Sequence, residues 1–453
     1  MGNIEDSIAA ISTGTGGAVS IIRISGKSSP EIANSVWKGR KKLGPDGRRT
    51  MLLGRCVSPD SRFFEQAVAV YFPGPASYTG EDMVEIHCHG GNLVSRKVLE
   101  LVIHAGARQA DPGEFTCRAF MNGKLDLTQA EGVSEIISAR TSMALNLAER
   151  QTSGILGRTI REIRSSLIHV LSECESRLDF PEENLDWKPA GELCIELAGA
   201  ISEIEKLLKY RTEGAILREG IRIVIAGRPN VGKSSLLNIL LGYDRAIVTP
   251  LPGTTRDTVE ELAAIRNIPV RLIDTAGIRE ADNIIENKGI ERSMASIRQA
   301  QVILWLLDAS SDHSDEIKTM NGHVAGRTNA IAVWNKTDLL AKSAGLPQTG
   351  IPTVEISAGK NDGIERLLDV IEKSIWGFPH TDEPETAVST RHSTLLEEAL
   401  EALPGAVEKI KSQEWELASV SLHAAVTALG KITGEDASPD MLDEIFSRFC
   451  IGK

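Results

Sequence analysis

The sequence of 453 residues lacks the features of several large classes of protein. It contains no apolar run long enough to span a membrane, and its N-terminus has no basic stretch followed by an apolar core. We therefore expect neither a membrane-spanning nor a secreted protein and predict a cytoplasmic location. A net positive charge is also lacking, because 62 acidic residues outnumber 50 basic ones and the formal net charge is −12. No overall field attracts nucleic acid or an anionic membrane, so any RNA contact must use a local basic patch.

Cysteine is scarce and scattered, with six residues and no Cys-x-x-Cys pair. A zinc site or a dithiol redox motif is therefore not predicted. His87, Cys88 and His89 resemble metal ligands, but on a strand the Cys88 side chain faces away from both histidines, so we predict no metal site there. Five cysteines are expected to be ordinary buried or half-buried thiols. Cys450 differs because it lies three residues from the end of the sequence.

A phosphate-binding loop is predicted near the middle of the chain. A short apolar stretch typical of a buried parallel strand precedes the pattern Gly-x-x-x-x-Gly-Lys-Ser, which runs from Gly227 to Ser234 and leads into a helical run. The glycines allow backbone N–H groups to surround a phosphate chain. Lys233 is expected to reach the β- and γ-phosphates, and the Ser234 hydroxyl is expected to bind Mg²⁺. The helix N-terminus adds positive potential. Four other residues of this segment are predicted to contact the nucleotide: Asn230, Val231, Gly232 and Ser235.

Two later segments predict that the base is guanine. Asn335, Lys336 and Asp338 follow an apolar, strand-like stretch. The Asp338 carboxylate can accept hydrogen bonds from both the N1–H group and the exocyclic amine of guanine, whereas adenine has no such pair of donors. Ser357 and Ala358 follow the next strand-like stretch and fit a further contact to the base. The sequence therefore predicts a GTP site.

Two segments between these motifs are predicted to sense the γ-phosphate. Asp274 begins an Asp-Thr-Ala-Gly motif after a strand-like stretch and would hold Mg²⁺ through water, while the Gly277 N–H would contact the γ-phosphate. Thr255 is the natural second hydroxyl for Mg²⁺. We expect these loops to be ordered by the γ-phosphate and released after hydrolysis. The other residues of the two segments predicted to contact GTP are Thr249, Pro250, Leu251, Pro252, Gly253, Thr254, Thr275 and Ala276.

The glutamine that orients the attacking water in Ras-like enzymes is missing, because Ile278 occupies its position. The Asn230 carbonyl oxygen and backbone carbonyls of residues 249–253 could surround a monovalent cation that supplies positive charge beside the phosphates. Arg256 is a competing source of that charge, and an ordinary surface arginine is the alternative reading of it.

Water activation requires a carboxylate near the γ-phosphate. Glu286 is the best placed in the sequence, although the sequence alone does not separate it from Glu280 or Glu291.

Periodicity predicts three kinds of domain. Residues 1–120 combine strand-like runs with a helix, and residues 121–217 and 379–453 have helical spacing, with Pro404 expected to break or kink one helix. Residues 218–378 alternate strands and helices, which is typical of a doubly wound sheet that binds ligands at the C-terminal ends of its strands. We therefore predict a multidomain α+β and α/β protein. It has an N-terminal α+β domain, a discontinuous all-α helical domain and an inserted Ras-like G domain, with two unrelated helical domains as the alternative.

The sequence resembles the MnmE (TrmE) family of bacterial tRNA-modifying GTPases over its whole length. The matching segments are GRPNVGKSSLLN, TPLPGTTRD, DTAGIRE, NKTD, the terminal CIGK, IIRISG, SYTGEDMVEIHCHGG and GEFTCRAFMNGKLDLTQAE. The resemblance implies a folate-binding N-terminal domain that forms a homodimer, a split helical domain and a G domain. It also implies that the protein works with the FAD-dependent protein MnmG. Together they add an aminomethyl or carboxymethylaminomethyl group to C5 of the wobble uridine of certain tRNAs, while GTP hydrolysis drives the conformational cycle.

The resemblance implies roles for individual residues of the G domain. Potassium-dependent dimerisation of the G domains replaces an arginine finger in the family, and Glu286 matches the water-orienting glutamate. The implied Mg²⁺ ligands are Ser234 and Thr255, and the implied K⁺ ligands are Asn230, Thr249, Leu251 and Thr254.

A folate site is also implied by the resemblance. Arg23, Glu85, Lys124 and Lys453 match folate-contacting positions, where cationic groups suit the glutamate tail and a carboxylate suits pterin N–H donors. The one-carbon donor would be 5-formyltetrahydrofolate or 5,10-methylenetetrahydrofolate. Cys450 matches the terminal cysteine needed for modification, as a nucleophile or proton donor; a role in packing the tail is the alternative.

A second function stays open at this stage. The same G domain could serve a regulatory or ribosome-assembly GTPase without modification chemistry. A C-terminal tail far from Arg23 would favour that function. Residues 13–20 read TGTGGAVS, whereas members of the family usually have a proline-containing, glycine-rich stretch with an arginine there.

Overall fold

The chain folds into two compact units. The second unit is inserted into the sequence of the first, and each is described by itself. The first unit comprises Met1–Ser134, Arg150–Leu208 and Arg391–Lys453, and the second comprises Glu135–Glu149 and Lys209–Thr390. The computed structural model describes residues 6–14, 16–60, 62–180, 187–243, 260–274, 295–311, 314–324, 326–340, 345–376 and 388–453.

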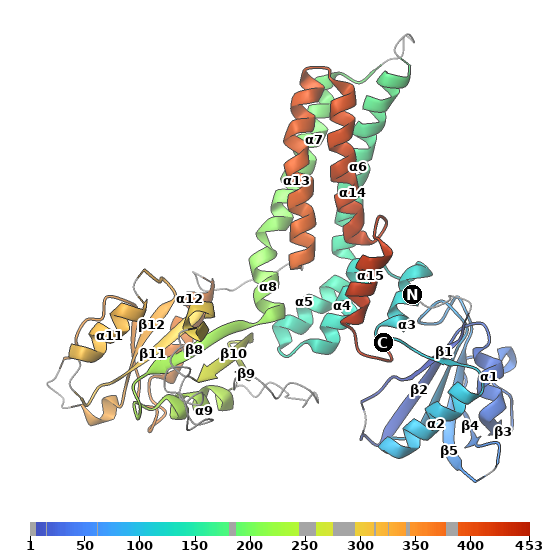
Figure 1. The fold of residues 1–453 in the computed structure, drawn as a ribbon, viewed down its shortest axis with the longest axis horizontal. Helices are drawn as coiled ribbons and strands as arrows, with labels where there is room; N and C mark the ends of the chain where they lie inside the picture. Colours follow the sequence, from blue (N-terminus) through green and yellow to red (C-terminus); the bar gives the residue numbers. More distant parts are fainter. Residues whose placement is uncertain are drawn as a thin grey trace. The chain divides into compact units, whose positions relative to one another are not determined.

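The N-terminal part of the first unit is built on a seven-stranded sheet (Figure 1). Its strand order is β3-β4-β5-β6-β2-β1-β7. The strands are β1 Ile8–Ile11, β2 Val19–Ser25, β3 Trp37–Gly39, β4 Leu52–Val57, β5 Phe64–Phe72, β6 Met83–His89 and β7 Arg108–Gln109. Helices α1 (Ser29–Val36) and α2 (Asn92–His104) pack on one face, and a short 3₁₀ turn, η1, spans Pro45–Gly47.

Alternation along the strands decides which side chains meet these helices. Ile22 and Ile24 of β2 and Ile86 of β6 are fully buried with the residues of α1 and α2. Successive side chains of a strand point to opposite faces. The other face therefore carries Arg23 and Glu85.

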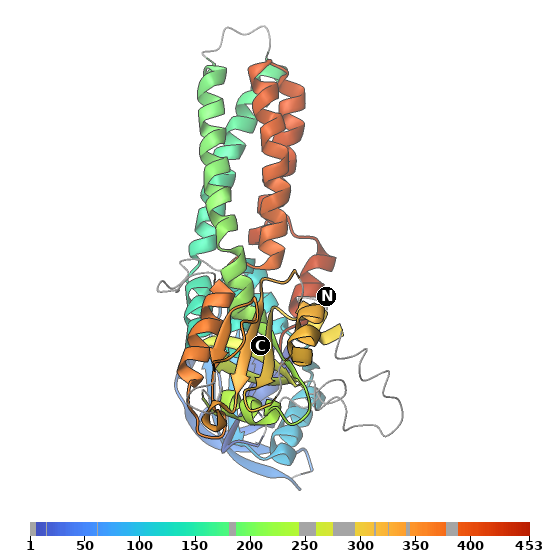
Figure 2. The ribbon, with the colours of Figure 1, turned by 90° about the vertical axis from the view of Figure 1, so that its left-hand side faces the viewer.

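The helical part of the first unit gathers segments from both ends of the chain. Long helices α6, α7, α13 and α14 lie side by side in Figures 1 and 2, and α6 packs closely along α14. The helices of the first unit beyond α1 and α2 are α3 Glu114–Met121, α4 Leu127–Ser138, α6 Ile155–Asp179, α7 Ala190–Lys209, α13 Thr390–Lys411, α14 Trp415–Thr433 and α15 Pro439–Ser447. Most of α5, Ser142–Thr152, belongs to the second unit. No helix within the described ranges has the length and apolar composition needed to cross a bilayer.

The expected break at Pro404 does not occur, because α13 continues through it. A proline inside a helix costs about 3 kcal/mol through a lost hydrogen bond and a steric clash. Here Leu396, Leu403, Ala406 and Ile410 are all fully buried on the packed side of α13. This apolar stripe on both sides of Pro404 offsets the local cost.

The second unit is a doubly wound α/β domain, which confirms the predicted fold class. Its sheet has the order β13-β12-β11-β8-β10-β9, and every neighbouring pair is parallel except β9 with β10. One face packs against α9 and α12, and the other packs against α11. The strands are β8 Ile221–Gly227, β9 Glu260–Ile265, β10 Ile268–Asp274, β11 Val302–Asp308, β12 Ala330–Asn335 and β13 Thr353–Glu355. The helices are α8 Arg211–Glu219, α9 Lys233–Tyr243, α11 Ser314–Val324, η2 Thr337–Leu339 and α12 Ile364–Trp376.

Strand β9 was not predicted from the sequence. Only its second half is buried, so its apolar signal is short, and it pairs antiparallel at the edge of the sheet.

A buried ion cluster joins α4 to α13 in the first unit. Arg391 donates to both carboxylate oxygens of Glu131, over 2.7 and 2.9 Å, and His392 Nε2 lies 2.6 Å from Glu131 Oε2. Arg391 also donates to the carbonyls of Lys431 and Ile432 in α14. Burial opposes ionisation of Glu131, but His392 and Arg391 outweigh it and hold the pKa of this carboxyl far below its ordinary value. The cluster therefore fastens the start of α13 where the chain returns from the second unit.

We expect Glu131→Gln to lower the free energy of unfolding by about 3 kcal/mol, because it removes the carboxylate shared by the half-buried Arg391 and the fully buried His392. Chemical denaturation at pH 7.5 measures this loss. The pKa of Glu131 is lower in the folded state, so its stabilising effect is full above about pH 4.3 and fades below that. The gap between the native protein and the variant should therefore narrow as the pH falls below that value. Glu162→Gln, at an exposed position on α6, is the matched control. A gap of constant size at low pH would contradict this account.

Candidate functional site

The predicted phosphate loop follows the central strand of the second unit. β8 lies between β10 and β11 and is parallel to both, and α9 begins at Lys233 directly after the loop. The strands that follow β8 in the chain are added first on its β10 side and then on its β11 side, so the order of the sheet switches at β8. Domains of the α/β class bind their ligands at the C-terminal edge of the sheet at such a switch point, and the loop leaves β8 there.

Close packing explains two glycines of this loop. Gly227 has φ +143°, and a Cβ atom there would lie 2.5 Å from the Leu306 carbonyl oxygen. Gly232 has φ +98°, and a Cβ there would lie 2.2 Å from Asn335 Nδ2. Any larger residue would push the loop away from β11 and from the predicted guanine motif.

The structure brings the predicted phosphate and magnesium groups together. The Lys233 Nζ donates to the carbonyls of Gly227 at 3.0 Å and Arg228 at 2.7 Å, which folds the lysine back over its own loop. The Ser234 hydroxyl donates to Asp274 Oδ2 at 3.3 Å, at the end of β10. A hydroxyl beside a carboxylate is a set of hard oxygen donors that suits Mg²⁺.

Asn335 connects the phosphate loop to the predicted base site. Its side chain is 2% exposed at the end of β12. Its Nδ2 donates to the Val231 carbonyl at 2.7 Å, and its Oδ1 accepts from the Ala358 amide at 2.9 Å. One buried amide therefore fixes the spacing between the two segments that would hold the phosphates and the base.

The neighbouring charged residues of the base site are also held in place. Asp338 Oδ1 accepts from the Ser357 hydroxyl at 2.7 Å. Lys336 forms a 2.6 Å ion pair with Asp308 at the end of β11. Burial opposes ionisation of Asp308, but the hydrogen bonds from Lys336 and Ser310 outweigh it and lower the pKa of the carboxyl.

Several predicted residues lie outside the described residues. Asn230 and Ser235 are described and exposed, and Asn230 adopts φ +64°. The residues outside the description are Thr249, Pro250, Leu251, Pro252, Gly253, Thr254, Thr255, Arg256, Thr275, Ala276, Gly277, Ile278, Glu280, Glu286 and Glu291.

Two of the predicted folate contacts pair directly in the first unit. Arg23 donates to Glu85 Oε1 at 2.9 Å, and their side chains are 17% and 13% exposed. The Arg23 guanidinium also lies 5.4 Å from the ring centroid of Tyr78 and 5.6 Å from that of Phe115. Burial opposes ionisation of Glu85, but the hydrogen bond with His87 and the charge of Arg23 outweigh it and lower its pKa. The pair therefore stays ionised and offers both donors and acceptors beside an aromatic ring.

The C-terminal tail lies against the same domain. The Cys450 carbonyl accepts from the Gly113 amide at 3.3 Å, and Ile451 pairs with Pro112 as an isolated β-bridge. A Cβ at Gly452, which has φ +91°, would lie 2.4 Å from the Ile11 carbonyl oxygen. Ile11 ends β1, whose preceding residue is the register partner of Arg23. The tail is therefore next to the strand pair that carries Arg23.

The remaining tail and folate residues are placed as follows. The Cys450 side chain is exposed, and the Lys453 amide donates to the Cys450 carbonyl at 3.3 Å. Lys124 Nζ donates to the Pro75 carbonyl at 2.9 Å, in the loop that also carries Tyr78. All four predicted folate contacts thus belong to this domain or to the tail packed on it.

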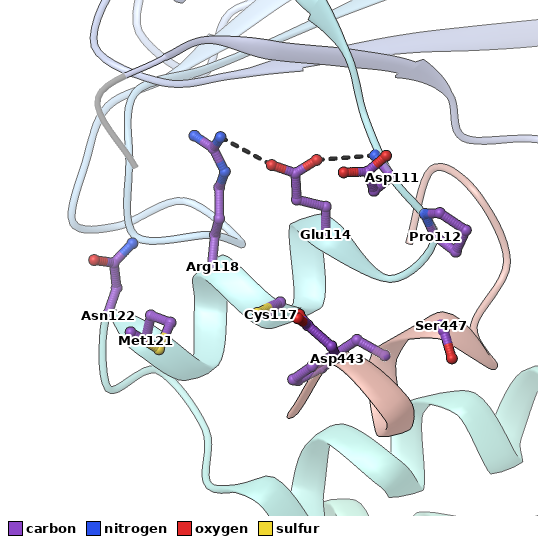
Figure 3. Close-up of a pocket in the computed structure, with 10 residues that line it drawn as sticks. Asp111, Pro112, Glu114, Cys117, Arg118, Met121, Asn122, Asp443 and Ser447 are labelled. Carbon is purple, nitrogen blue, oxygen red and sulfur yellow. Dashed lines mark hydrogen bonds and ion pairs between the residues drawn. The ribbon is translucent and has the colours of Figure 1, made fainter. Parts of the chain in front are cut away.

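A cavity that the sequence did not reveal lies between α3 and α15. Its volume is about 330 Å³, and Figure 3 shows Glu114 between Arg118 and the Asp111 backbone. Arg118, 5% exposed, also pairs with Asp6 and Glu81. The lining residues are Asp111, Pro112, Glu114, Cys117, Arg118, Met121, Asn122, Asp443, Phe446 and Ser447.

The thiol in this cavity is not activated. Burial raises the pKa of Cys117 to about 11, and Glu114 and Asp443 act in the same direction. A thiol in this state is a weak nucleophile. The sequence carried no sign of this cavity, because the walls of the cavity come from two helices that are far apart in the sequence.

Among the described residues, no group of three or more histidine, cysteine or acidic side chains is placed to hold a metal ion. Cys88 packs into the core with α1 and α2, whereas His87 lies 3.6 Å from Glu85 and His89 contacts Glu65.

Comparison with known proteins gives matches over the whole chain. One family model, described as the GTP-binding protein TrmE N-terminus, matches residues 7–124, and another, described as the MnmE helical domain, matches residues 127–450. The chain is 42% identical over 457 residues to the tRNA modification GTPase MnmE of Natranaerobius thermophilus, covering 99% of this chain and all of that protein. The protein of the same name from Aquifex aeolicus is 40% identical over 453 residues, with the same coverage. A solved structure of Era from Aquifex aeolicus is 27% identical and covers 40% of this chain and 66% of that one, with a TM-score of 0.27.

The base site predicts a change of specificity. We expect Asp338→Asn to weaken GTP binding on the order of a hundredfold, because an amide cannot accept both guanine donors and leaves one unpaired. The same amide can donate to the carbonyl that xanthine carries in place of the guanine amine, so affinity for XTP should rise relative to GTP. Displacement of a fluorescent guanine nucleotide by GTP and by XTP measures both changes. Asp362→Asn, an exposed change in the neighbouring loop, is the control. Unaltered preference for GTP over XTP would contradict the assignment of Asp338.

Proposed function

The chain belongs to the MnmE family of tRNA modification GTPases, and from this premise we propose that it modifies C5 of the wobble uridine of certain tRNAs. In this proposal it acts as a homodimer with an FAD-dependent MnmG-type partner and adds an aminomethyl or carboxymethylaminomethyl group. The observation that supports it most is the C-terminal tail, which packs beside the strand pair that carries Arg23. A regulatory or ribosome-assembly GTPase has no need to hold an exposed Cys450 against a second domain.

A tetrahydrofolate derivative is the one-carbon donor in this proposal. The residues present fit its chemistry, since Glu85 is an ionised acceptor for pterin N–H groups and Arg23, Lys124 and Lys453 are cationic. The rings of Tyr78 and Phe115 lie beside the Arg23 guanidinium. Phe115 is fully buried, so the half-buried Tyr78 ring supplies the apolar wall of the site. The bound folate would supply the carbon at the oxidation level of either formyl or methylene.

Cys450 has two possible parts in the reaction. Its side chain is exposed at the end of the tail, where a thiol can reach a substrate as a nucleophile or proton donor. Alternatively it positions the tail, whose backbone is held by Gly113 and Pro112.

GTP hydrolysis drives the conformational cycle in this proposal. Lys233 and the loop amides bind the phosphates, Ser234 and Thr255 hold Mg²⁺, and Glu286 orients the attacking water. Asn230, Thr249, Leu251 and Thr254 would hold K⁺, which would supply positive charge beside the phosphates and so favour pairing of two G domains. Arg256 is the alternative source of that charge.

We expect GTP turnover to be faster in K⁺ than in Na⁺ by about tenfold or more, because one well-placed charge has an effect of at least that size. Asn230→Ala should abolish the difference. Asn230 has φ +64°, which alanine adopts poorly, so Asn230→Gly is the better variant because it keeps this backbone conformation. Phosphate release in matched chloride salts measures the rates. Equal rates in both salts, or K⁺ activation retained by Asn230→Gly, would count against a potassium site.

The role of Cys450 can be tested in cells. If the thiol takes part in the chemistry, Cys450→Ser should abolish wobble-uridine modification, measured by mass spectrometry of tRNA nucleosides, while GTP turnover stays normal. Cys194→Ser, a half-buried cysteine of α7, is the control. Normal modification in the Cys450→Ser strain would leave the cysteine a packing role only.

A further inference from the structure

One stretch of the N-terminal domain is strongly basic in an acidic protein. Residues 38–62 contain eight basic residues against two acidic ones, a local excess of six positive charges, whereas the whole chain has a net charge of −12. We call these eight residues the basic edge: Lys38, Arg40, Lys41, Lys42, Arg48, Arg49, Arg55 and Arg62. The sign of the charge in this stretch is therefore opposite to that of the chain as a whole.

All eight side chains of the basic edge are exposed. Within the described part of the chain, only Arg62 among them forms an ion pair, over 3.6 Å with Asp60, and both partners are highly exposed. Arg161 and Arg164 of α6 differ, because Arg161 pairs with Asp126 and Arg164 pairs with acidic residues after α14. The charges of the basic edge are thus available to a partner, whereas those of Arg161 and Arg164 are satisfied within the protein.

Strand pairing places part of the basic edge on the face that carries the predicted folate contacts. Lys38 of β3 pairs with Arg55 of β4, and Arg55 pairs with Gln66 of β5. Val70 lies four residues after Gln66 on β5, so their side chains point to the same face of the sheet. Val70 pairs with Glu85 of β6, and Glu85 pairs with Arg23 of β2. Lys38, Arg55, Glu85 and Arg23 therefore share one face of the sheet, opposite α1 and α2.

The distances along this face suit one nucleic-acid ligand. The edge strand β3 is three strand spacings from β6 and four from β2, or about 14 and 19 Å. Between them, Leu53 and Phe64 are each 64% exposed, and the Arg55 guanidinium lies 5.5 Å from the Phe64 ring centroid. An exposed aromatic ring beside arginine is a platform on which a base can stack.

We propose that the basic edge binds the phosphate backbone of the tRNA and holds it beside the face that bears Arg23 and Glu85. This inference rests on the proposed function, because it takes the tRNA as substrate. Lysines on an edge strand can also serve to prevent edge-to-edge pairing of sheets. However, that role needs charge on the edge strand only, whereas Arg48, Arg49, Arg55 and Arg62 lie outside β3. A row of exposed cations with an exposed aromatic ring favours RNA over a lipid surface, which has no bases to stack.

The test is binding of an unmodified tRNA transcript to the full chain over a series of NaCl concentrations. The triple variant Arg40→Gln, Lys41→Gln, Lys42→Gln should bind about tenfold or more weakly at 0.1 M salt. Each lost phosphate contact lowers the slope of log K against log salt by about 0.7 to 0.9, so three should lower it by about 2. GTP turnover in the second unit should be unchanged, and an unchanged thermal unfolding transition would show that the N-terminal domain of the variant is folded.

Two control variants accompany the triple variant. Arg366→Gln, Lys373→Gln, Lys411→Gln removes the same charge from exposed positions on α12 and α13, and its tRNA affinity should stay within about twofold. Arg40→Lys, Lys41→Arg, Lys42→Arg keeps the charge and should keep the affinity. Equal losses in the first control and the triple variant would overturn the proposal.

Two further outcomes would also overturn it. One is unchanged tRNA affinity and salt slope in the triple variant. The other is that the triple variant loses binding to phosphatidylserine vesicles but keeps its binding to tRNA, which would identify the partner as a membrane.

Wobble-uridine analysis separates this inference from the proposed function. If the native chain supports modification but the triple variant binds tRNA normally, only the basic edge is wrong. If tRNA binding needs the basic edge but the native chain supports no modification, the proposed chemistry is wrong instead.

Discussion

The nucleotide site depends on one buried side-chain amide. Asn335 donates to the phosphate loop at Val231 and accepts from the backbone amide of Ala358, and it is almost completely excluded from water. Because a buried amide that loses a partner is costly, the two contacts hold each other in place. The same side chain lies where a Cβ at Gly232 would collide with it. The predicted phosphate loop and the predicted base loop are therefore fixed together.

The N-terminal sheet is organised by the alternation of its strands. One face buries an apolar layer under α1 and α2, and the other face carries Arg23, Glu85 and the basic residues of β3 and β4. The tail ends beside β1, and two glycines make this possible. Gly113 allows the close approach of Phe446 and Phe449, and Gly452 allows contact with the Ile11 backbone. The first and last segments of the chain thus form one surface, on which the proposed folate and tRNA contacts would meet.

Much of the fold could be predicted from the sequence, because its signals are local. The buried parallel strands before the phosphate loop and the guanine motif are short apolar runs, and α2 and α7 show helical periodicity. Where the local signal failed, tertiary packing was the cause. The apolar stripe of α13 carries the helix through Pro404, and β9 is held as an edge strand by pairing with β10 although only half of it is apolar.

The sequence by itself was enough to predict the nucleotide site, because a phosphate loop and a guanine motif each depend on a few neighbouring residues. It also determined the family, through motifs spread over the whole chain. Only the tertiary structure decided which distant residues meet: Arg23 with Glu85, the tail with β1, Glu131 with Arg391, and the cavity between α3 and α15. It also decided that Lys38 and Arg55 share a face with Glu85. Strand register and helix packing depend on contacts between segments far apart in the chain, and local residue patterns do not encode these contacts directly.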